Sequence, residues 1–299
     1  MLPNLLIVGA AKSGTTSMAN FLNKSQNIFI PDIKECRFFS GLGSNFVGLG
    51  AEKFINQGIR KLGDYSQLYN QRNEAVLADC SNDYLYYYQS AIPKILDILG
   101  PETKIIIILR NPAHRAFSNY CHHLRDGWED ISFKQALLDE SQRKKDYWAW
   151  SYHYSAVGFY HNSVKAYLDN FKNTKVILFE ELTEEVRKDS FYEFLGIEND
   201  LVQTPFGRDN ISGEPKWTKL RDFMIKETAL KRMLKLCLSN VGLLDASSRL
   251  ARFIKNKNIS PVSMSESDYN QLIGNYRNDI ILLADLLNRD LNHWLKYEG

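Results

Sequence analysis

Cysteine is scarce in this sequence, and what there is forms no pattern. The four cysteines, Cys36, Cys80, Cys121 and Cys237, stand far apart, and no Cys-x-x-Cys pair occurs. This spacing excludes a small domain framed by disulfides and is typical of reduced thiols in a cytosolic protein.

Long apolar runs and an excess of one charge are also missing. No stretch approaches the roughly 18 apolar residues that a membrane-spanning helix needs. The apolar start at 5–8 lacks a basic segment before it, so it indicates a first strand rather than a signal peptide. Lys and Arg total 37 against 35 Asp and Glu, a net charge of +2, which gives no signature of a nucleic-acid partner. We therefore expect a soluble, cytoplasmic protein.

What is present is an ordinary globular composition with alternating strand and helix signals. The chain has 299 residues, 44% of them hydrophobic, which excludes disordered and collagen-like classes. Four short apolar runs predict buried strands, at 5–8, 76–79, 105–109 and 176–179. Helical spacing lies between them, at 18–25, 90–99, 114–124, 133–139 and 161–170. This alternation predicts an α/β fold, a doubly wound parallel sheet flanked by helices, with ligands beyond the carboxyl ends of the strands.

Two regions depart from the alternation. Residues 41–73 are polar and rich in glycine, which indicates a cap or insertion. After residue 204 the strand signals stop, leaving a loop at 206–217 and helices near 218–238 and 266–295. We interpret 1–299 as one domain with a helical C-terminal region.

The turn after the first strand has the character of an anion site. Gly9 to Ser17 reads Gly-Ala-Ala-Lys-Ser-Gly-Thr-Thr-Ser between a strand and a helix. Backbone N–H groups and the helix dipole converge at such a turn, and small residues let a phosphate approach the backbone. Lys12 adds a positive charge, and Thr15, Thr16 and Ser17 add hydroxyl donors. A glycine-rich turn without a ligand is the alternative, because short motifs of this kind recur by accident.

The same turn fits an ATP-binding loop poorly. That loop reads Gly-x-x-x-x-Gly-Lys-Ser/Thr, with lysine directly after the second glycine. Here Gly9 and Gly14 keep the glycine spacing, but Thr15 occupies the lysine position. A nucleotide kinase or ATPase is thus the less favoured hypothesis. A nucleotide-binding module without catalysis stays open beside it.

Two elements together resemble the sulfotransferases that use 3′-phosphoadenosine 5′-phosphosulfate (PAPS). The first is Lys12-Ser13-Gly14-Thr15-Thr16, which is similar to the family's 5′-phosphosulfate loop. The second begins at Arg110, directly after the strongest strand, and has Ser118 eight residues further on. It resembles the family's 3′-phosphate element, and a guanidinium with a hydroxyl two helical turns away can grip one phosphate.

Weaker similarities extend over nearly the whole chain and point to the heparan-sulfate-type branch and bacterial relatives. They include Lys34-Glu35 followed by Phe38-Phe39, the turn at 81–85, Gly158-Phe159-Tyr160, Glu180-Glu181-Leu182, the loop at 210–216 and the C-terminal segment at 276–294. The resemblance implies a P-loop-like sulfotransferase fold, with 204–299 supplying a loop that closes over the nucleotide and C-terminal helices.

The resemblance also implies an activity and a set of site residues. The enzyme would move a sulfuryl group from PAPS to a hydroxyl, or less readily an amine, of a carbohydrate, lipid-linked or small-molecule acceptor, and release PAP, the 3′,5′-bisphosphate, without a metal. Lys12 and Glu35 are the implied catalytic residues. The implied nucleotide-binding residues are Lys12, Ser13, Gly14, Thr15, Thr16, Ser17, Arg110, Ser118, Ser212, Gly213 and Lys216.

The general base stays open at this point. Glu35 matches the catalytic glutamate of the heparan-sulfate branch, but it could equally be a surface acid paired with Lys34 or Arg37. His122 and His123 are the rivals, since they follow the 3′-phosphate element. Adjacent histidines lack the spacing of zinc ligands.

Departures from the branch pattern bear on the acceptor. Cys80 stands where heparan-sulfate enzymes carry a lysine, and Asn82 where they carry a proline, which argues against an anionic polysaccharide. Among the aromatic residues, Trp148, Trp150 and Tyr152 are candidates to border the acceptor cleft. The basic segment at 216–235 leaves a peripheral membrane contact open.

Overall fold

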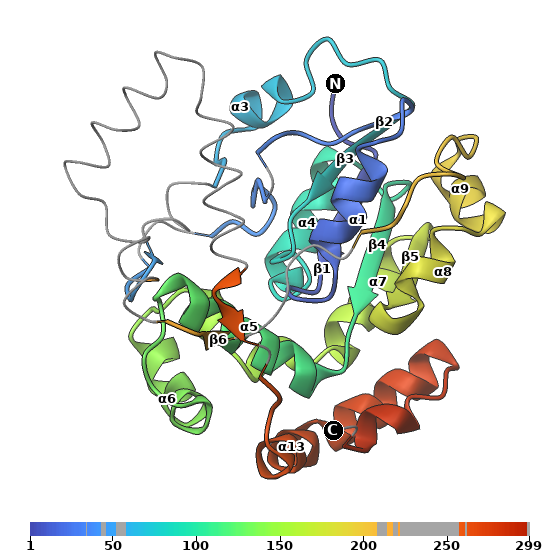
Figure 1. Ribbon diagram of the computed structural model, residues 1–299. Coiled ribbons are helices and arrows are strands. Elements are labelled where there is room, and N and C mark those ends of the chain that lie inside the picture. The colour runs from blue at the N-terminus through green and yellow to red at the C-terminus, as the bar shows by residue number, and fades with distance from the viewer. Residues whose placement is uncertain are drawn as a thin grey trace.

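Five parallel strands form the central sheet, in the order β2-β3-β1-β4-β5. The strands are β1 (Leu5–Gly9), β2 (Ile28–Phe29), β3 (Val76–Cys80), β4 (Lys104–Leu109) and β5 (Thr174–Leu178). The parallel α/β architecture predicted from the sequence is confirmed. Figure 1 shows helices on both sides of this sheet.

The structure is a computed structural model and describes residues 1–33, 35–42, 46–51, 58–207, 214–217, 221, 257–260 and 262–297. The predicted helix near 218–238 lies outside these residues except for position 221. The division into one domain with a cap at 41–73 stays a prediction.

Alternation along the strands divides the core into two layers. Leu6 and Val8 of β1 pack on one face of the sheet, whereas Leu5 and Ile7 pack on the other. All five residues of β1 are buried, as a central strand covered on both faces requires. The uninterrupted isoleucine run of β4 divides in the same way, so both faces receive large branched side chains.

Different helices cover the two faces (Figure 1). One face carries α4 (Tyr88–Ile98), α5 (Pro112–Asp126), α7 (His161–Asn170) and α13 (Glu266–Leu287). The other carries α1 (Thr15–Leu22), α8 (Leu182–Glu185) and α9 (Asp189–Leu195). The remaining helices among the described residues are α3 (Leu62–Gln67) and α6 (Phe133–Lys145).

Element boundaries differ from the sequence expectations at a few positions. The predicted helix over 266–295 is interrupted, because Asn288 adopts a left-handed conformation with φ 50° and ends α13. A separate 3-10 turn follows at Asn292–Leu295. Strand β5 ends at Leu178, and Phe179 begins a 3-10 turn instead of closing the strand. Three short strands were missed. They are β2 and the antiparallel pair β6 (Glu214–Pro215) and β7 (Ile259–Ser260), which have two residues each and leave no periodic signal.

The connections place a crevice between β1 and β4. The helix after β1 is α1, on one face, and the helix after β4 is α5, on the other. The two neighbouring strands therefore send their chains to opposite faces, and a ligand crevice is expected at such a switch point.

Candidate functional site

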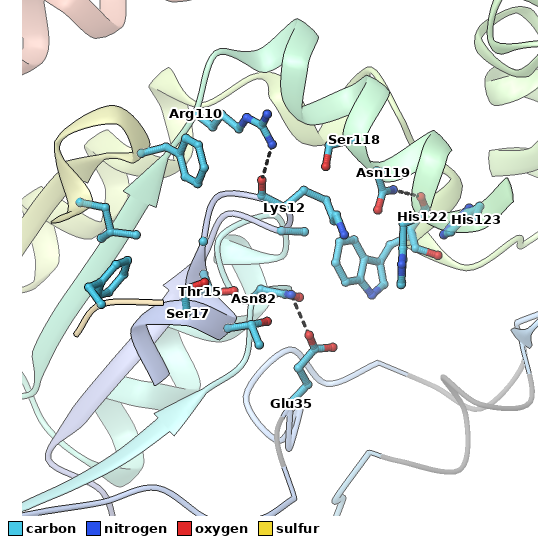
Figure 2. A pocket seen from close by; sticks show the side chains of 18 of the residues that line it. Lys12, Thr15, Ser17, Glu35, Asn82, Arg110, Ser118, Asn119, His122 and His123 are labelled. Carbon is cyan, nitrogen blue, oxygen red and sulfur yellow. Dashed lines mark hydrogen bonds between the residues drawn. The ribbon is translucent and has the colours of Figure 1, made fainter. Parts of the chain in front are cut away.

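A cavity of about 630 Å³ opens at the predicted place, beyond the carboxyl ends of the strands. Its volume lies in the range usual for small-molecule sites. The described residues that line it come from the phosphate loop, the loops after β2 and β3, α5, the turn at 150–152 and the segment after β5 (Figure 2). They are Ala11, Lys12, Gly14, Thr15, Thr16, Ser17, Glu35, Asn82, Arg110, Ser118, Asn119, His122, His123, Trp150, Ser151, Phe179, Leu182, Thr183 and Phe206.

The phosphate loop leads directly into α1. Gly14 precedes the first helical residue with φ 92°, and a Cβ there would lie 2.8 Å from Cδ2 of Leu182. Glycine is therefore required on two counts, backbone conformation and space. The first intrahelical bond runs from Met18 N–H to Gly14 C=O, so the N–H groups of the first turn end at the cavity wall. Of the nucleotide-binding residues predicted at 12–17, only Ser13 is absent from the wall, and it is fully buried.

Lys12 carries the positive charge of this loop into the cavity. Figure 2 shows its side chain extending from the loop toward α5. The pKa of Lys12 is lowered to about 7, chiefly by burial and then by the charges of Arg125 and Arg110, whereas Asp126 and Glu35 oppose the fall. The ammonium is thus poised to gain stability from an incoming anion.

Arg110 and Ser118 lie on the wall beside this loop (Figure 2). Arg110 directly follows β4, donates from its guanidinium to the Lys12 C=O at 3.2 Å, and lies 4.8 Å from the centre of the Phe179 ring. Ser118 faces the cavity from α5, whose start is fixed by Asn111: its side chain accepts from the N–H groups of residues 113 and 114. The predicted phosphate pair is therefore brought to one cavity with Lys12.

Glu35 reaches the cavity and is held there by two donors. Asn82 Nδ2 donates to Glu35 Oε1 at 2.8 Å, and a guanidinium nitrogen of Arg37 lies 2.7 Å from Oε2. The Glu35 N–H donates to the Cys80 C=O at 3.2 Å, which ties this loop to the end of β3. From the sequence, a pairing of Glu35 with Arg37 and a place for Glu35 in the cavity were alternatives. The structure shows both. Lys34 lies outside the described residues.

A buried carboxyl supports this arrangement from behind. Asp79 accepts hydrogen bonds from Tyr65 at 2.7 Å, Tyr84 at 2.8 Å and Ser81 at 2.7 Å. The Ser81 hydroxyl in turn accepts from the N–H of Arg37 at 3.1 Å. Burial raises the pKa of Asp79, and the three hydroxyl donors oppose the rise. The network fixes the segment that carries Glu35.

The two histidines of α5 both line the cavity, but their hydrogen bonds differ. Arg125 donates to His122 Nδ1, so the proton of a neutral His122 ring sits on Nε2. His123 Nδ1 lies 2.8 Å from the Tyr154 hydroxyl, which itself donates to Glu129 at 3.0 Å. Because that hydroxyl has given its proton to Glu129, it accepts from His123 Nδ1–H and leaves His123 Nε2 unprotonated.

Both rings are held neutral at ordinary pH. Burial lowers the pKa of His122 well below its usual value, and it lowers the pKa of His123 to about 3; the charge of Lys12 is the second cause in each case. Within the described part of the chain, no group of three or more His, Cys, Asp or Glu side chains is arranged to hold a metal ion. None of the described helices is long and apolar enough to cross a membrane.

The loop at 210–216, which was predicted to close over the nucleotide, lies mostly outside the described residues. Ser212 and Gly213 lie outside the described residues. Lys216 is exposed and absent from the cavity wall, and its N–H donates to the Asn258 C=O at 2.7 Å. The role predicted for these three residues stays a prediction.

Sequence reasoning missed several wall residues. Trp150 of the three aromatic candidates lines the cavity, whereas Trp148 and Tyr152 do not. No role in the site was predicted from the sequence for two amide side chains and three apolar ones on the wall, Asn82, Asn119, Phe179, Leu182 and Phe206. Phe179 could have been found, because it is the last residue of a predicted strand, at the carboxyl end where ligands are expected.

Comparison with known proteins identifies the family. Residues 2–205 match the family model described as a sulfotransferase domain, which is more than half of the chain. The chain belongs to the sulfotransferase family. It is therefore a transferase enzyme, and the kinase, ATPase and non-catalytic readings are set aside.

A solved structure covers this sulfotransferase almost completely. The crystal structure of a sulfotransferase from Alicyclobacillus acidocaldarius is 30% identical, with a TM-score of 0.74 over 99% of this chain and 100% of that one. The parallel sheet and its flanking helices are therefore those of a sulfotransferase.

Curated relatives match a shorter part. The bifunctional heparan sulfate N-deacetylase/N-sulfotransferase 1 of Caenorhabditis elegans is 34% identical over 128 residues, 41% of this chain and 13% of that protein. The membrane-associated sulfotransferase kil1 of Dictyostelium discoideum is 29% identical over 119 residues, 40% of this chain and 22% of that protein. This sulfotransferase thus matches less than a quarter of the length of either relative.

Proposed function

We propose that this enzyme transfers the sulfuryl group of PAPS to a hydroxyl of its acceptor and releases PAP. The observation that carries the proposal is a pair of anion-binding groups in one cavity. Lys12 and the start of α1 form one group, and Arg110 with Ser118 forms the other. PAP carries two phosphates on one nucleoside, so its charge distribution matches two such groups.

The apolar part of the wall suits the nucleobase. Phe179, Leu182 and Phe206 line the cavity beside Arg110 and α1. Arg110 lies over the Phe179 ring, so the same guanidinium borders both the proposed 3′-phosphate position and this apolar wall. The residues present therefore fit a nucleotide with phosphates on both sides of its sugar.

PAPS supplies an activated sulfuryl group when it is bound. Lys12 holds its ammonium toward the negative charge that builds up on the leaving phosphate oxygen, the type of electrostatic stabilisation that lowers barriers most. The N–H groups at the start of α1 and the hydroxyls of Thr15, Thr16 and Ser17 hold the 5′-phosphate. These roles need positioning and charge stabilisation, and no covalent step on the protein.

Glu35 takes the proton of the acceptor hydroxyl. Its carboxylate lies on the wall, and Asn82 and Arg37 hold both oxygens in place. His122 is a poor alternative, because its Nδ1 accepts from Arg125 and its Nε2 then carries the proton.

An amine is the second candidate for the acceptor group, since the heparan sulfate relatives are named as N-sulfotransferases. We expect the enzyme to act in the cytoplasm, which fractionation of the producing cells would test.

Calorimetry with PAP, ADP and ATP–Mg²⁺ tests the nucleotide. We expect the wild type to bind PAP most tightly, and Arg110→Ala to lose that preference by about 10- to 100-fold, the value of a charge-assisted hydrogen bond. Arg72→Ala is the matched control, because Arg72 stacks on Phe29 away from the cavity. Preference for ATP–Mg²⁺, or PAP binding unchanged in Arg110→Ala, contradicts the proposal.

A further inference from the structure

Trp294, near the C-terminus, is joined to two parts of the proposed nucleotide site without lining the cavity itself. Its backbone C=O accepts a hydrogen bond from Asn111, the neighbour of Arg110. Its indole N–H donates to Glu180, the neighbour of Phe179. Arg110 and Phe179 both line the cavity, and they lie against each other. A residue bonded to the neighbours of two wall residues can fix how those two residues lie relative to each other.

The Arg110 side of this connection is a buried hydrogen-bond network. Asn111 Nδ2 donates to the Trp294 C=O at 3.2 Å and to the Tyr269 hydroxyl at 2.9 Å. The Tyr269 hydroxyl donates to the same C=O at 2.8 Å. The C=O of Arg110 accepts from the Tyr160 hydroxyl at 3.0 Å, and the Tyr160 ring centre lies 6.5 Å from that of Trp294. The backbone that carries the guanidinium is therefore held by the C-terminal segment.

The Phe179 side depends on one carboxylate. Trp294 Nε1 donates to Glu180 Oε1 at 2.8 Å, and His293 Nε2 lies 2.7 Å from the same oxygen. Glu180 belongs to the 3-10 turn that begins with Phe179, directly after β5. The Glu180 side chain is 40% exposed, so its replacement disturbs no packed core. The carboxylate ties the turn that carries Phe179 to the buried Trp294.

The next residue of the turn offers a contrast. Glu181 Oε2 lies 2.6 Å from Arg289 Nη1, and both side chains are about two-fifths exposed. This ion pair links the same turn to the same C-terminal part of the chain, but it does not include Trp294. Exposed ion pairs contribute little to stability. Glu181 is therefore a natural comparison for Glu180.

We propose that Trp294 is a positioning residue for recognition of the 3′-phosphate of the nucleotide. Through Asn111 it sets the backbone from which the Arg110 guanidinium extends. Through Glu180 it sets the ring against which that guanidinium lies. The arrangement orders a long, otherwise mobile side chain before the phosphate arrives, which lowers the entropic cost of binding. The proposal rests on the proposed function, because it concerns the nucleotide of that reaction.

The test compares PAP with AMP by calorimetry, because the two ligands differ only in the 3′-phosphate. We expect Glu180→Ala and Trp294→Phe each to reduce the preference for PAP over AMP about 3- to 10-fold, the value of one hydrogen bond. AMP affinity should stay unchanged. It also reports on folding, since AMP needs the same phosphate loop. Asn111 is left intact, because its side chain caps α5 as well.

Three further variants test the bond between the two side chains. Glu180→Gln keeps an oxygen that accepts from the indole N–H, so it should retain most of the preference for PAP. Glu181→Ala is the matched control and should leave both affinities unchanged. The double variant Glu180→Ala/Trp294→Phe should lose no more than the more affected single variant, because both changes remove one shared bond.

Three outcomes would overturn the role of Trp294. They are an unchanged preference for PAP in Glu180→Ala and Trp294→Phe, an equal loss of PAP and AMP affinity in both, and additive losses in the double variant. The wild type is measured first. If it binds PAP no more tightly than AMP, the proposed function fails and the role of Trp294 fails with it. If the wild type prefers PAP and the variants do so equally, only the role of Trp294 is wrong.

Discussion

The side-chain amide of Asn82 donates to Oε1 of Glu35 at 2.8 Å, on the wall of the cavity. The bond fixes one oxygen of the carboxylate, while Arg37 fixes the other at 2.7 Å. A general base works best when its geometry is set before the substrate arrives. The relationship makes Asn82 a positioning residue for Glu35.

Replacement of Glu35 should therefore separate chemistry from nucleotide binding. We expect Glu35→Gln to lower kcat by about 10²–10⁴-fold, the usual contribution of a general base, with PAP affinity unchanged. Asn82→Ala should lower kcat less, since Glu35 keeps its carboxyl group and loses only one of the two donors that hold it in place. PAP calorimetry and acceptor kinetics measure both, and a loss of PAP affinity equal to the loss of rate would count against the role of Glu35.

Lys12 should take up a proton when PAP binds. Its pKa is lowered to about 7 in the free protein, chiefly by burial, so most of the population is neutral at pH 8. Phosphate charge beside the amine raises that pKa, which favours the ammonium. PAP affinity should then increase as the pH falls from 8.5 toward 6.

Calorimetry in buffers of different ionisation enthalpy measures this proton uptake at pH 8. Lys12→Met, which has a similar shape and no charge, should bind PAP more weakly and lose most of the uptake. Equal uptake in the wild type and in Lys12→Met would assign the proton to another group.

The neighbouring histidines should hold opposite neutral tautomers. His122 accepts at Nδ1 from Arg125, and His123 donates from Nδ1 to Tyr154. Nitrogen NMR of protein labelled in its 6 histidines should show His122 protonated at Nε2 and His123 protonated at Nδ1, with both rings neutral at pH 7. Tyr154→Phe should remove the bond that keeps the proton of His123 on Nδ1, so that His123 alone loses its preference for one neutral tautomer.

A matched pair elsewhere in the molecule controls this measurement. His153 Nδ1 lies 3.0 Å from the Tyr86 hydroxyl, and neither residue lines the cavity. Tyr86→Phe should change the signals of His153 and leave His123 as it is. A protonated Nε2 on His123 in the wild type would refute the hydrogen-bond chain through Glu129.

The Asp79 network should dominate local stability. Asp79→Ala leaves the hydroxyls of Tyr65, Tyr84 and Ser81 buried without their acceptor, so we expect the free energy of unfolding to fall by about 3–5 kcal/mol. Tyr69→Phe is the comparison, because Tyr69 makes one longer bond, 3.3 Å to the Ala78 C=O, and its loss should cost about 1 kcal/mol. Urea denaturation measures both, and equal losses would contradict a special role for Asp79.

The same carboxyl gives a pH dependence of known sign. Burial raises the pKa of Asp79, so the folded state keeps the proton at pH values where the unfolded chain has released it. Its contribution to stability is complete below the ordinary value of 3.8 and is lost as the pH rises through the raised folded pKa. Asp79→Asn should remove this slope from the pH dependence of the unfolding free energy, relative to the wild type.

The nucleotide side of the site could be predicted because it is local in sequence. The loop at 9–17 and the pair Arg110 and Ser118 each follow a strand that its apolar run identifies, and parallel strands bring their carboxyl ends to one edge. The resemblance to sulfotransferases depended on these same segments. Lys216 and the loop at 208–213 had no such anchor, since no apolar strand precedes them.

The rest of the cavity wall was predicted only in part, for the opposite reason. Trp150 was one of three aromatic candidates, but Ser151 lies beside it in a 3-10 turn of three residues with no periodic signal, and Asn82 looked only like a departure from a family pattern. The orientation of His122 and His123 could not be read at all, because it depends on partners from 125, 129 and 154.

The sequence by itself determined the four longer strands of the sheet, the phosphate loop and the fold class, because short apolar runs and glycine spacing are properties of neighbouring residues. Only the tertiary structure decided which polar groups are paired. Asn82 meets Glu35 across 47 positions, and Asn119 meets Ser151 across 32. Hydrogen bonds act over about 3 Å, so such partners are fixed by packing and leave no pattern along the chain.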